Sequence, residues 1–393
     1  MTEEATRPEL MREALGFDDI GLIAADQSNI ASRKQVYTYT KLSKNITIEY
    51  PIISSPMDTI SDVDTCIALN NIGAAGILHR FMSIEEQVEK AEKINKESGA
   101  AYVAIGLGDY EERINTLLKS SADPDLLFLD TANGASIQVT EFMRWWNNKK
   151  KSFASDYISP DMIIGNTMSK ASVSRAFNLG ADGIRHGIGI GSMCITSMQT
   201  GIHCPAVTSL YYGWKAKRNY ELQQADSENY DEFSIRLPEN PMPTILCDGG
   251  IRKPADLVKA IISGADAVIC GNIFAGCIET PGEIIEKPGE KPGESFSKFK
   301  KFRGMASKAV VDDYELGDGT TENTFIEGEE MLVPYNGKSV VDVVHELNNG
   351  LRSAMSYLDY EKLKDMKGTL WTGGVKAIRL TNSSYIEGTP HGK

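Results

Sequence analysis

Eight short apolar runs constrain the fold of this chain more than any other feature of its sequence. Each run ends in a polar or glycine-rich tip and is followed by a helical pattern. The runs span residues 51–57, 73–80, 101–106, 126–132, 162–167, 183–188, 244–250 and 267–272. Continuous rather than alternating apolar residues are typical of strands buried on both faces. Eight strand–helix units in series predict an α/β fold, a closed (β/α)₈ TIM barrel, with residues 1–393 forming a single domain.

A doubly wound open sheet is the main alternative, but no GxGxxG sequence follows the first run, which disfavours it. The segments between the runs carry helix-end signals. Ser83 and Glu86 have the spacing of a capping box. The segment 253–263 has Pro254 in its first turn and stops before Gly264, which predicts another helix.

Three segments do not fit the repeat. Residues 211–242 are polar and mixed, and we expect an excursion from the sixth unit. Residues 286–294 (EKPGEKPGE) are rich in Pro, Gly and charge, which predicts a mobile surface hairpin or loop. Residues 306–333 have weak periodicity and predict an active-site flap, because long loops at a barrel mouth are usually functional.

The composition excludes several classes of protein. A formal net charge of −13 argues against binding nucleic acid through phosphate neutralisation. Six cysteines without a CxxC pair predict neither a disulfide framework nor structural zinc, and they fit reduced thiols in a cytoplasmic setting. The acidic N-terminus does not resemble a signal peptide, and no run of about 18 apolar residues predicts a membrane span.

The segment 187–196 (GIGIGSMCIT) is the strongest candidate for chemistry. Its three alternating glycines let the backbone take positive φ and approach a bound molecule closely. Cys194 follows, so a thiol is held at the edge of a glycine-rich loop, where it is a candidate nucleophile if its pKa is lowered. The alternative is a glycine-rich turn beside a buried structural cysteine.

In a barrel of this type the active site lies at the C-terminal ends of the strands. The tips of the runs therefore predict a set of residues that converge on one rim: Ser55, Met57, Asp58, His79, Arg80, Asp130, Asn133, Asn166, residues 189–196, Asp248, Gly271 and Asn272. Taken singly, Asp58 or Asn166 can also be read as a polar cap that only satisfies local amides. For His79 a structural role is favoured over acid–base chemistry.

The last two runs end in residues 248–250 (DGG) and in Gly271-Asn272. Loops after the seventh and eighth strands of such barrels commonly bind phosphate through backbone N–H groups. Asp248 would repel a phosphate but can accept hydrogen bonds from a ribose diol. The pattern predicts a nucleoside monophosphate with its base directed toward Cys194.

These residues resemble those of the family of IMP dehydrogenases and GMP reductases, and the match runs through most of the sequence. The matching segments follow the family's order: residues 54–59 (SSPMDT), 165–166 (GN), 189–196 (GIGSMCIT), 248–250 (DGG) and 303–305 (RGM). The resemblance implies that Cys194 attacks C2 of a purine and that a nicotinamide cofactor exchanges hydride with that carbon.

Four features resemble the reductase branch. Residues 130–134 (DTANG) are similar to its fourth-strand motif, and residues 200–201 (TG) are similar to the residues that follow its cysteine loop. The segment 304–328 is short and lacks the adjacent Arg-Tyr pair with which dehydrogenases activate water. No CBS insertion separates Arg80 from Ala101.

Other segments are at least as similar to dehydrogenases, namely residues 279–283 (ETPGE) and 350–353 (GLRS). Glu327-Gly328 is similar to both branches. Gly271-Asn272 stands where the family has a phosphate-binding Gly-Ser, so a deoxynucleotide or a modified purine nucleotide is an alternative ligand.

The resemblance also implies roles for individual residues. Catalysis is assigned to Cys194, Thr196, Glu327 and Asp130, with Thr196 and Glu327 moving a proton. Substrate contacts are assigned to Ser55, Met57, Asn166, Gly191, Ser192, Asp248, Gly249, Gly250, Gly271, Asn272, Gly304, Met305, Ala306 and Gly328. Cofactor contacts are assigned to Asp58, Arg80, Asp130, Thr131, Ala132 and Asn133. The backbone carbonyls of Gly189, Gly191 and Cys194 are assigned to a K⁺ ion.

The resemblance therefore predicts a cytoplasmic, homotetrameric GMP reductase that uses NADPH and converts GMP to IMP and ammonia. One alternative is an IMP dehydrogenase that uses NAD and water to form XMP. A second alternative, from another class, is a non-catalytic purine-nucleotide-binding protein.

Overall fold

The computed structural model describes residues 13–155, 157–224, 241–288, 296–307 and 328–388. Its centre is a parallel sheet of eight strands in the order β4-β11-β10-β9-β8-β7-β6-β5. Backbone hydrogen bonds between the β4 region and Ala75, just before β5, bring the two edges of the sheet together. The strands are β4 (Ile52–Ser54), β5 (Ile77–Leu78), β6 (Tyr102–Ile105), β7 (Leu126–Asp130), β8 (Asp161–Thr167), β9 (Gly183–His186), β10 (Thr244–Asp248) and β11 (Ala267–Cys270). This confirms the predicted (β/α)₈ barrel, and each strand falls within or next to its apolar run.

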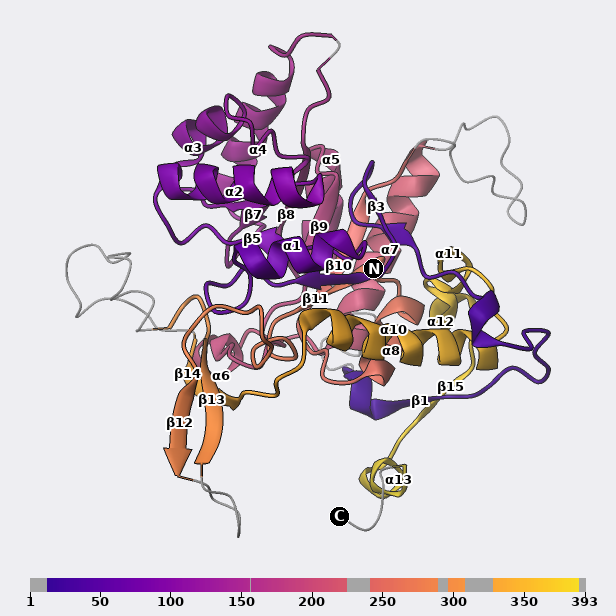
Figure 1. The fold of residues 1–393 in the computed structure, drawn as a ribbon. Coiled ribbons are helices and arrows are strands. Elements are labelled where there is room, and N and C mark those ends of the chain that lie inside the picture. Colours follow the sequence, from indigo (N-terminus) through magenta and orange to yellow (C-terminus); the bar gives the residue numbers. More distant parts are fainter. Residues whose placement is uncertain (1–12, 156, 225–240, 289–295, 308–327, 389–393) are drawn as a thin grey trace.

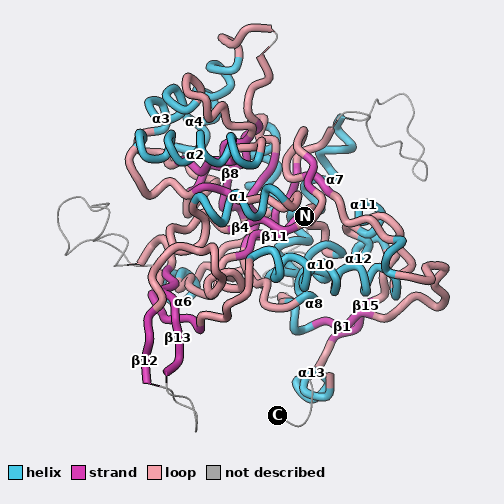
Figure 2. Tube along the Cα trace, in the orientation of Figure 1, coloured by secondary structure: helices cyan, strands magenta, loops and turns pink. Residues whose placement is uncertain are grey.

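Helices lie between successive strands and surround the sheet (Figures 1 and 2). They are α1 (Val63–Asn71), α2 (Ile84–Ser98), α3 (Tyr110–Leu117), α4 (Ile137–Lys150), α5 (Lys170–Asn178), α7 (Ala206–Gln224), α8 (Pro254–Ile262) and α10 (Val340–Tyr357). The predicted helix starts are confirmed: the Ser83 side chain accepts a hydrogen bond from the N–H of Glu86, and Pro254 is the first residue of α8. Among the described helices, none is long and apolar enough to cross a membrane.

Both faces of the barrel strands are buried, which explains why the runs are continuously apolar. In β6, Tyr102 and Ala104 face a core inside the barrel, whereas Val103 and Ile105 pack in the larger core under the helices. A short hairpin, β2 (Thr40–Lys41) with β3 (Thr47–Ile48), adds side chains to the inner core.

The expected excursion at residues 211–242 is wrong over its first part. Tyr211 to Gln224 belong to the regular helix α7, and residues 225–240 lie outside the described part of the chain. The buried face of α7 continues beyond Leu210 through Gly213 and Ala216. These small residues carry little hydrophobic signal, so the helix is hidden in the sequence.

A three-stranded antiparallel sheet follows the barrel strand β11 and extends away from the barrel (Figure 1). It consists of β12 (Ile285–Pro288), β13 (Phe296–Arg303) and β14 (Glu330–Pro334). The hairpin or loop predicted at 286–294 begins inside β12, which pairs antiparallel with β13 as in a hairpin, and residues 289–294 lie outside the described residues. The flap predicted at 306–333 ends in β14, and residues 308–327 likewise lie outside them.

The remaining elements are short. They are η2 (Phe17–Asp19), β1 (Ile20–Leu22), η3 (Arg33–Gln35), α6 (Thr196–Thr200), α11 (Leu363–Met366), α12 (Thr369–Thr372), β15 (Ala377–Arg379) and α13 (Asn382–Glu387). β1 pairs with β15 in an antiparallel sheet, which brings residues near the two ends of the described chain together.

Candidate active site

A cavity of about 750 Å³ opens at the C-terminal ends of the barrel strands. This size is typical of small-molecule sites, which usually span roughly 300–1,000 Å³. Sequence-predicted residues that line it are Ser55, Met57, Arg80, Asp130, Thr131, Ala132, Asn166, Gly189, Gly191, Ser192, Cys194, Thr196, Asp248, Gly249, Gly250, Gly271, Asn272, Gly304, Met305, Ala306 and Gly328. The strand tips thus bring together segments that lie far apart in the chain.

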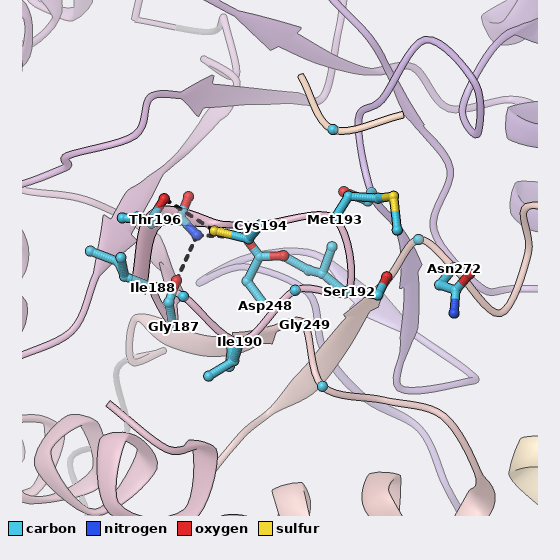
Figure 3. A pocket seen from close by; sticks show the side chains of 18 of the residues that line it. Gly187, Ile188, Ile190, Ser192, Met193, Cys194, Thr196, Asp248, Gly249 and Asn272 are labelled. Carbon is cyan, nitrogen blue, oxygen red and sulfur yellow. Dashed lines mark hydrogen bonds between the residues drawn. The ribbon is translucent and has the colours of Figure 1, made fainter. Parts of the chain in front are cut away.

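Cys194 lies in the loop between β9 and α6. Figure 3 shows it near the centre of the cavity wall, with Asp248 next to it and Asn272 at the right. Its thiol donates a hydrogen bond to Oγ1 of Thr196, with Sγ and Oγ1 3.1 Å apart. Burial raises the pKa of the other five thiols, those of Cys66, Cys204, Cys247, Cys270 and Cys277. Cys194 is partly exposed and faces the cavity, so it is the cysteine best placed to react with a bound molecule.

The two ends of the predicted flap lie against this loop. Gly328 forms β-bridges with both Cys194 and Ser307. The N–H of Glu329 donates to the carbonyl of Met193 at 3.1 Å, and the N–H of Gly304 donates to the carbonyl of Glu329 at 2.8 Å. Glu327, which was assigned a catalytic role, lies outside the described residues and directly precedes Gly328.

A network of largely buried charges forms part of the cavity wall. Arg185 on β9 pairs with Asp130 on β7 and with Asp248 on β10, and Arg80 pairs with the second oxygen of Asp130 at 3.0 Å. Burial alone would raise the pKa of the Asp130 carboxyl, but Arg185 and Arg80 outweigh it and hold that pKa below its usual value. Asp130 is therefore a carboxylate at neutral pH.

Asp248 is held in one orientation by donors to a single oxygen. Its Oδ2 accepts from Nε and Nη2 of Arg185, and from Nδ2 of Asn166 at 2.6 Å. Its Oδ1 receives no hydrogen bond from the described part of the chain. A carboxylate oxygen with free lone pairs on a cavity wall can accept the two hydroxyls of a sugar diol.

Three residues predicted at the rim do not line the described cavity, although each adjoins a residue that does. Asp58 is buried and pairs with Arg303, at the end of β13, and it does not line the described cavity. The Asn133 side chain accepts from the N–H of Ala135 at 3.0 Å and is also outside the described lining. His79 is buried, burial lowers its pKa to about 4, and its Nδ1 accepts a hydrogen bond from the N–H of Phe81 at 3.2 Å, which favours the expected structural role.

The structure also brings in residues that sequence reasoning did not single out. Arg185 could have been found, because a charged residue inside a buried apolar run requires a partner. His203 lines the cavity and contacts the cysteine loop. The N-terminal residues 16–19 form part of the cavity wall next to Gly250. These last two carry no local pattern that predicts their position.

Two of the three carbonyls assigned to K⁺ take part in hydrogen bonds within the described residues, and the K⁺ site stays a prediction. The carbonyl of Gly189 already accepts a hydrogen bond from His203, and that of Gly191 accepts one from the N–H of Cys194 at 3.2 Å. Among the described residues no cluster of three or more His, Cys, Asp or Glu side chains could hold a metal, so a cation at this loop would depend on backbone carbonyls.

Comparison with known proteins agrees with this geometry. The model of the IMP dehydrogenase / GMP reductase domain matches residues 14–391. Inosine-5'-monophosphate dehydrogenase of Borreliella burgdorferi is 30% identical, with 98% of each chain covered. GMP reductase of Streptococcus agalactiae serotype V is also 30% identical, covering 91% of this chain and 96% of its own. Inosine-5'-monophosphate dehydrogenase of Cryptosporidium parvum is 29% identical, covering 97% and 93%.

Proposed function

The chain belongs to the IMP dehydrogenase and GMP reductase family, and on this premise we propose that it is a GMP reductase. The proposed reaction is GMP + NADPH + 2 H⁺ → IMP + NADP⁺ + NH₄⁺. The family premise carries over the class of reaction, an oxidoreductase acting on purine nucleotides. The direction of the reaction and the cofactor are our proposal.

One observation supports the reductase direction above the others. Residues 130–132, which begin the reductase-like motif, line the cavity. The dehydrogenase-like segments 279–283 and 350–353 are not part of its described lining. Glu279 instead accepts hydrogen bonds from Ser339 and from the N–H of Val340, at the start of α10. Gly350 packs so closely against Pro254 that a Cβ added at position 350 would collide with the Cβ of Pro254. The dehydrogenase-like segments therefore lie away from the described cavity wall, where the reductase-like motif begins.

The proposed substrate position follows the geometry of the cavity. The phosphate lies on the backbone N–H groups near Gly250, Gly271 and Asn272, which suits an anion because small residues allow close approach. The ribose hydroxyls donate to the free Oδ1 of Asp248. The guanine then extends toward Cys194, with Met57 and Gly328 among the residues around it.

The chemistry begins with addition of the Cys194 sulfur to C2 of guanine. The exocyclic amine leaves as ammonia, and a thioimidate between sulfur and C2 remains. Because an amine leaves readily only when protonated, an acid must reach it. The Thr196 hydroxyl, 3.1 Å from the sulfur, is placed to pass a proton, and Glu327 is proposed as its source. After C2 receives a hydride, the sulfur departs as thiolate and IMP is released.

The nicotinamide cofactor supplies that hydride when it is bound. Arg80, Asp130 and Thr131 form a polar part of the cavity wall, next to Ala132, that would hold its nicotinamide end. The Asp130 carboxylate, fixed by its two arginines, orients a hydrogen-bond donor there. Asp58 and Asn133, although assigned to the cofactor, would reach it only after a rearrangement of their present contacts.

Two parallel assays test the proposal. Purified protein is incubated with GMP and NADPH, or with IMP and NAD, and the nicotinamide absorbance is followed. Loss of NADPH with release of ammonia supports the reductase. Formation of NADH from IMP would instead establish the dehydrogenase, and tight GMP binding without turnover in either assay would establish a nucleotide sensor. Repeating the first assay with dGMP tests the deoxynucleotide alternative raised by Asn272. The homotetramer, the cytoplasmic location and the single-domain organisation stay predictions from the sequence.

A further inference from the structure

We propose that His203 is a positioning residue that clasps the Cys194 loop closed, in the place assigned to a K⁺ ion. The inference deepens the proposed function, and it rests on that function for its turnover assays only. Nδ1 of His203 lies 3.1 Å from the carbonyl oxygen of Gly189, the first glycine of the candidate K⁺ site. A carbonyl oxygen can only accept, so Nδ1 carries the hydrogen of this bond.

The backbone is shaped to make this contact. Helix α6 ends at Thr200 and is capped by Gly201, whose φ of +73° turns the chain back toward the loop. The N–H of Gly201 donates to the carbonyl of Ser197 at 3.0 Å. Gly189 has a φ of +78°, and a Cβ there would lie 3.1 Å from the carbonyl oxygen of Ile202 and 3.2 Å from Nδ1 of His203. Only glycine at position 189 lets the two segments approach this closely.

The clasp closes a segment of chain that contains the proposed chemistry. Residues 189 and 203 are its ends, and Cys194 and Thr196 lie between them. Fixing both ends of a loop reduces the number of conformations open to its middle. The His203 hydrogen bond therefore favours the arrangement in which the Cys194 thiol faces Thr196 and the cavity.

The same contact competes with K⁺ for the carbonyl oxygen of Gly189. A K⁺ site built from the backbone needs several carbonyl oxygens directed at one centre. Here the carbonyls of Gly189 and Gly191 are directed at N–H donors of His203 and Cys194. His203 thus supplies from within the chain the anchoring that a bound cation would supply from solution.

The experiment compares the wild-type protein with His203→Ala and His203→Asn. Asparagine can place an N–H₂ donor near the position of Nδ1, whereas alanine cannot. His345→Asn is the matched control, because this exposed histidine on α10 lies outside the described cavity lining. Three quantities are measured: kcat and KM for GMP with increasing KCl at constant ionic strength, amide hydrogen exchange of peptides covering 187–203, and the midpoint of thermal unfolding.

We expect wild-type turnover to change less than about twofold across the KCl series. His203→Ala should lower kcat about tenfold at low KCl, the loss expected for one hydrogen bond, with a small change in KM. It should speed exchange in 187–203 by a similar factor while α7 is unaffected. Added KCl should partly restore the kcat of His203→Ala, and its midpoint of thermal unfolding should match that of the wild type. His203→Asn should recover most of the lost kcat. The control His345→Asn should match the wild type in all three measurements.

Strong K⁺ activation of the wild-type protein would overturn the proposal. So would His203→Ala with wild-type kcat and wild-type exchange, or an equal loss in His203→Asn and His203→Ala. If the wild-type protein turns over no purine nucleotide, the proposed function fails, but the exchange measurement still decides the clasp. Unchanged exchange in His203→Ala would then reject it, and faster exchange confined to 187–203 would support it.

Discussion

Arg185 donates two hydrogen bonds to one oxygen of Asp248, at 3.1 Å from Nε and 2.8 Å from Nη2. These two N–H groups and Nδ2 of Asn166 all donate to Oδ2 of Asp248, which leaves Oδ1 for a ligand. The remaining Nη1 of Arg185 pairs with Asp130. A single buried guanidinium therefore fixes both the carboxylate proposed for the ribose and the one proposed for the cofactor.

Replacing Arg185 by Leu should destabilise the protein strongly. Two buried carboxylates would lose their shared cation, and breaking a buried pair in this way typically costs about 3–5 kcal/mol. Chemical denaturation measures the change. As a control, Arg379→Leu removes an exposed guanidinium that pairs with Glu13 and should have almost no effect. Similar stability for the two variants would show that Arg185 is not essential to the network.

Cys194→Ala should abolish turnover and leave nucleotide binding largely intact, because the sulfur is needed for the covalent step rather than for affinity. Calorimetric titration with GMP measures binding, and the absorbance assay measures turnover. Cys204→Ser is the matched control, since this thiol is also partly exposed and is proposed to take no part in the reaction. Residual turnover in Cys194→Ala close to wild type would refute the covalent mechanism.

Thr196→Val should lower kcat by roughly 10²-fold, the lower end of what a positioned proton-transfer group contributes. KM for GMP should change little, because the hydroxyl contacts the thiol rather than the phosphate end. Thr196→Ser keeps the hydroxyl and should restore most of the activity. Equal losses in the two variants would indicate that the methyl group, through packing, matters more than the hydroxyl.

Asp182→Asn should stabilise the protein at pH 8. Burial, and next the nearby Asp161, raise the pKa of Asp182 to about 6, above the value of 3.8 for a free carboxyl. The folded state therefore binds this proton more tightly than the unfolded state, so the charge of Asp182 opposes folding fully above pH 6. The opposition fades as pH falls below 6 and is absent below about pH 4.

Asparagine removes this charge and can still accept the hydrogen bond from the N–H of Met162. The gain at pH 8 should reach up to about 3 kcal/mol, from a shift of roughly two pKa units. Urea denaturation at pH 8 and at pH 4 measures it, and the advantage of the variant should disappear at the lower pH. A constant difference at both values would rule out titration of Asp182 as its cause.

The barrel could be predicted from sequence because its strands are buried on both faces, so that each of them is a continuous apolar run. β6 illustrates this, with Tyr102 facing inward and Val103 facing the helices. The second half of α7 could not be predicted from the sequence, because its buried face is formed by Gly213 and Ala216, which are not strongly apolar.

The rim could be predicted because every strand tip of a parallel barrel reaches the same end. The contacts between side chains at the rim could not be predicted in this way. Arg185 and Asp130 are 55 positions apart, and their pairing depends on the neighbouring strands β7 to β9. Asp58 shows the same limit, since its partner Arg303 is 245 positions away, on a strand of the additional sheet.

The pairing of β13 with β14 sets Gly304 beside Glu329 and Ser307 beside Gly328. The chain thus leaves the cavity rim and returns to it at neighbouring points held by one small sheet. Because both points are fixed by the same small sheet, the sequence between them can change in length without moving the barrel strands or the Cys194 loop. The described cavity wall therefore sets where this stretch begins and ends, and leaves its composition open to variation.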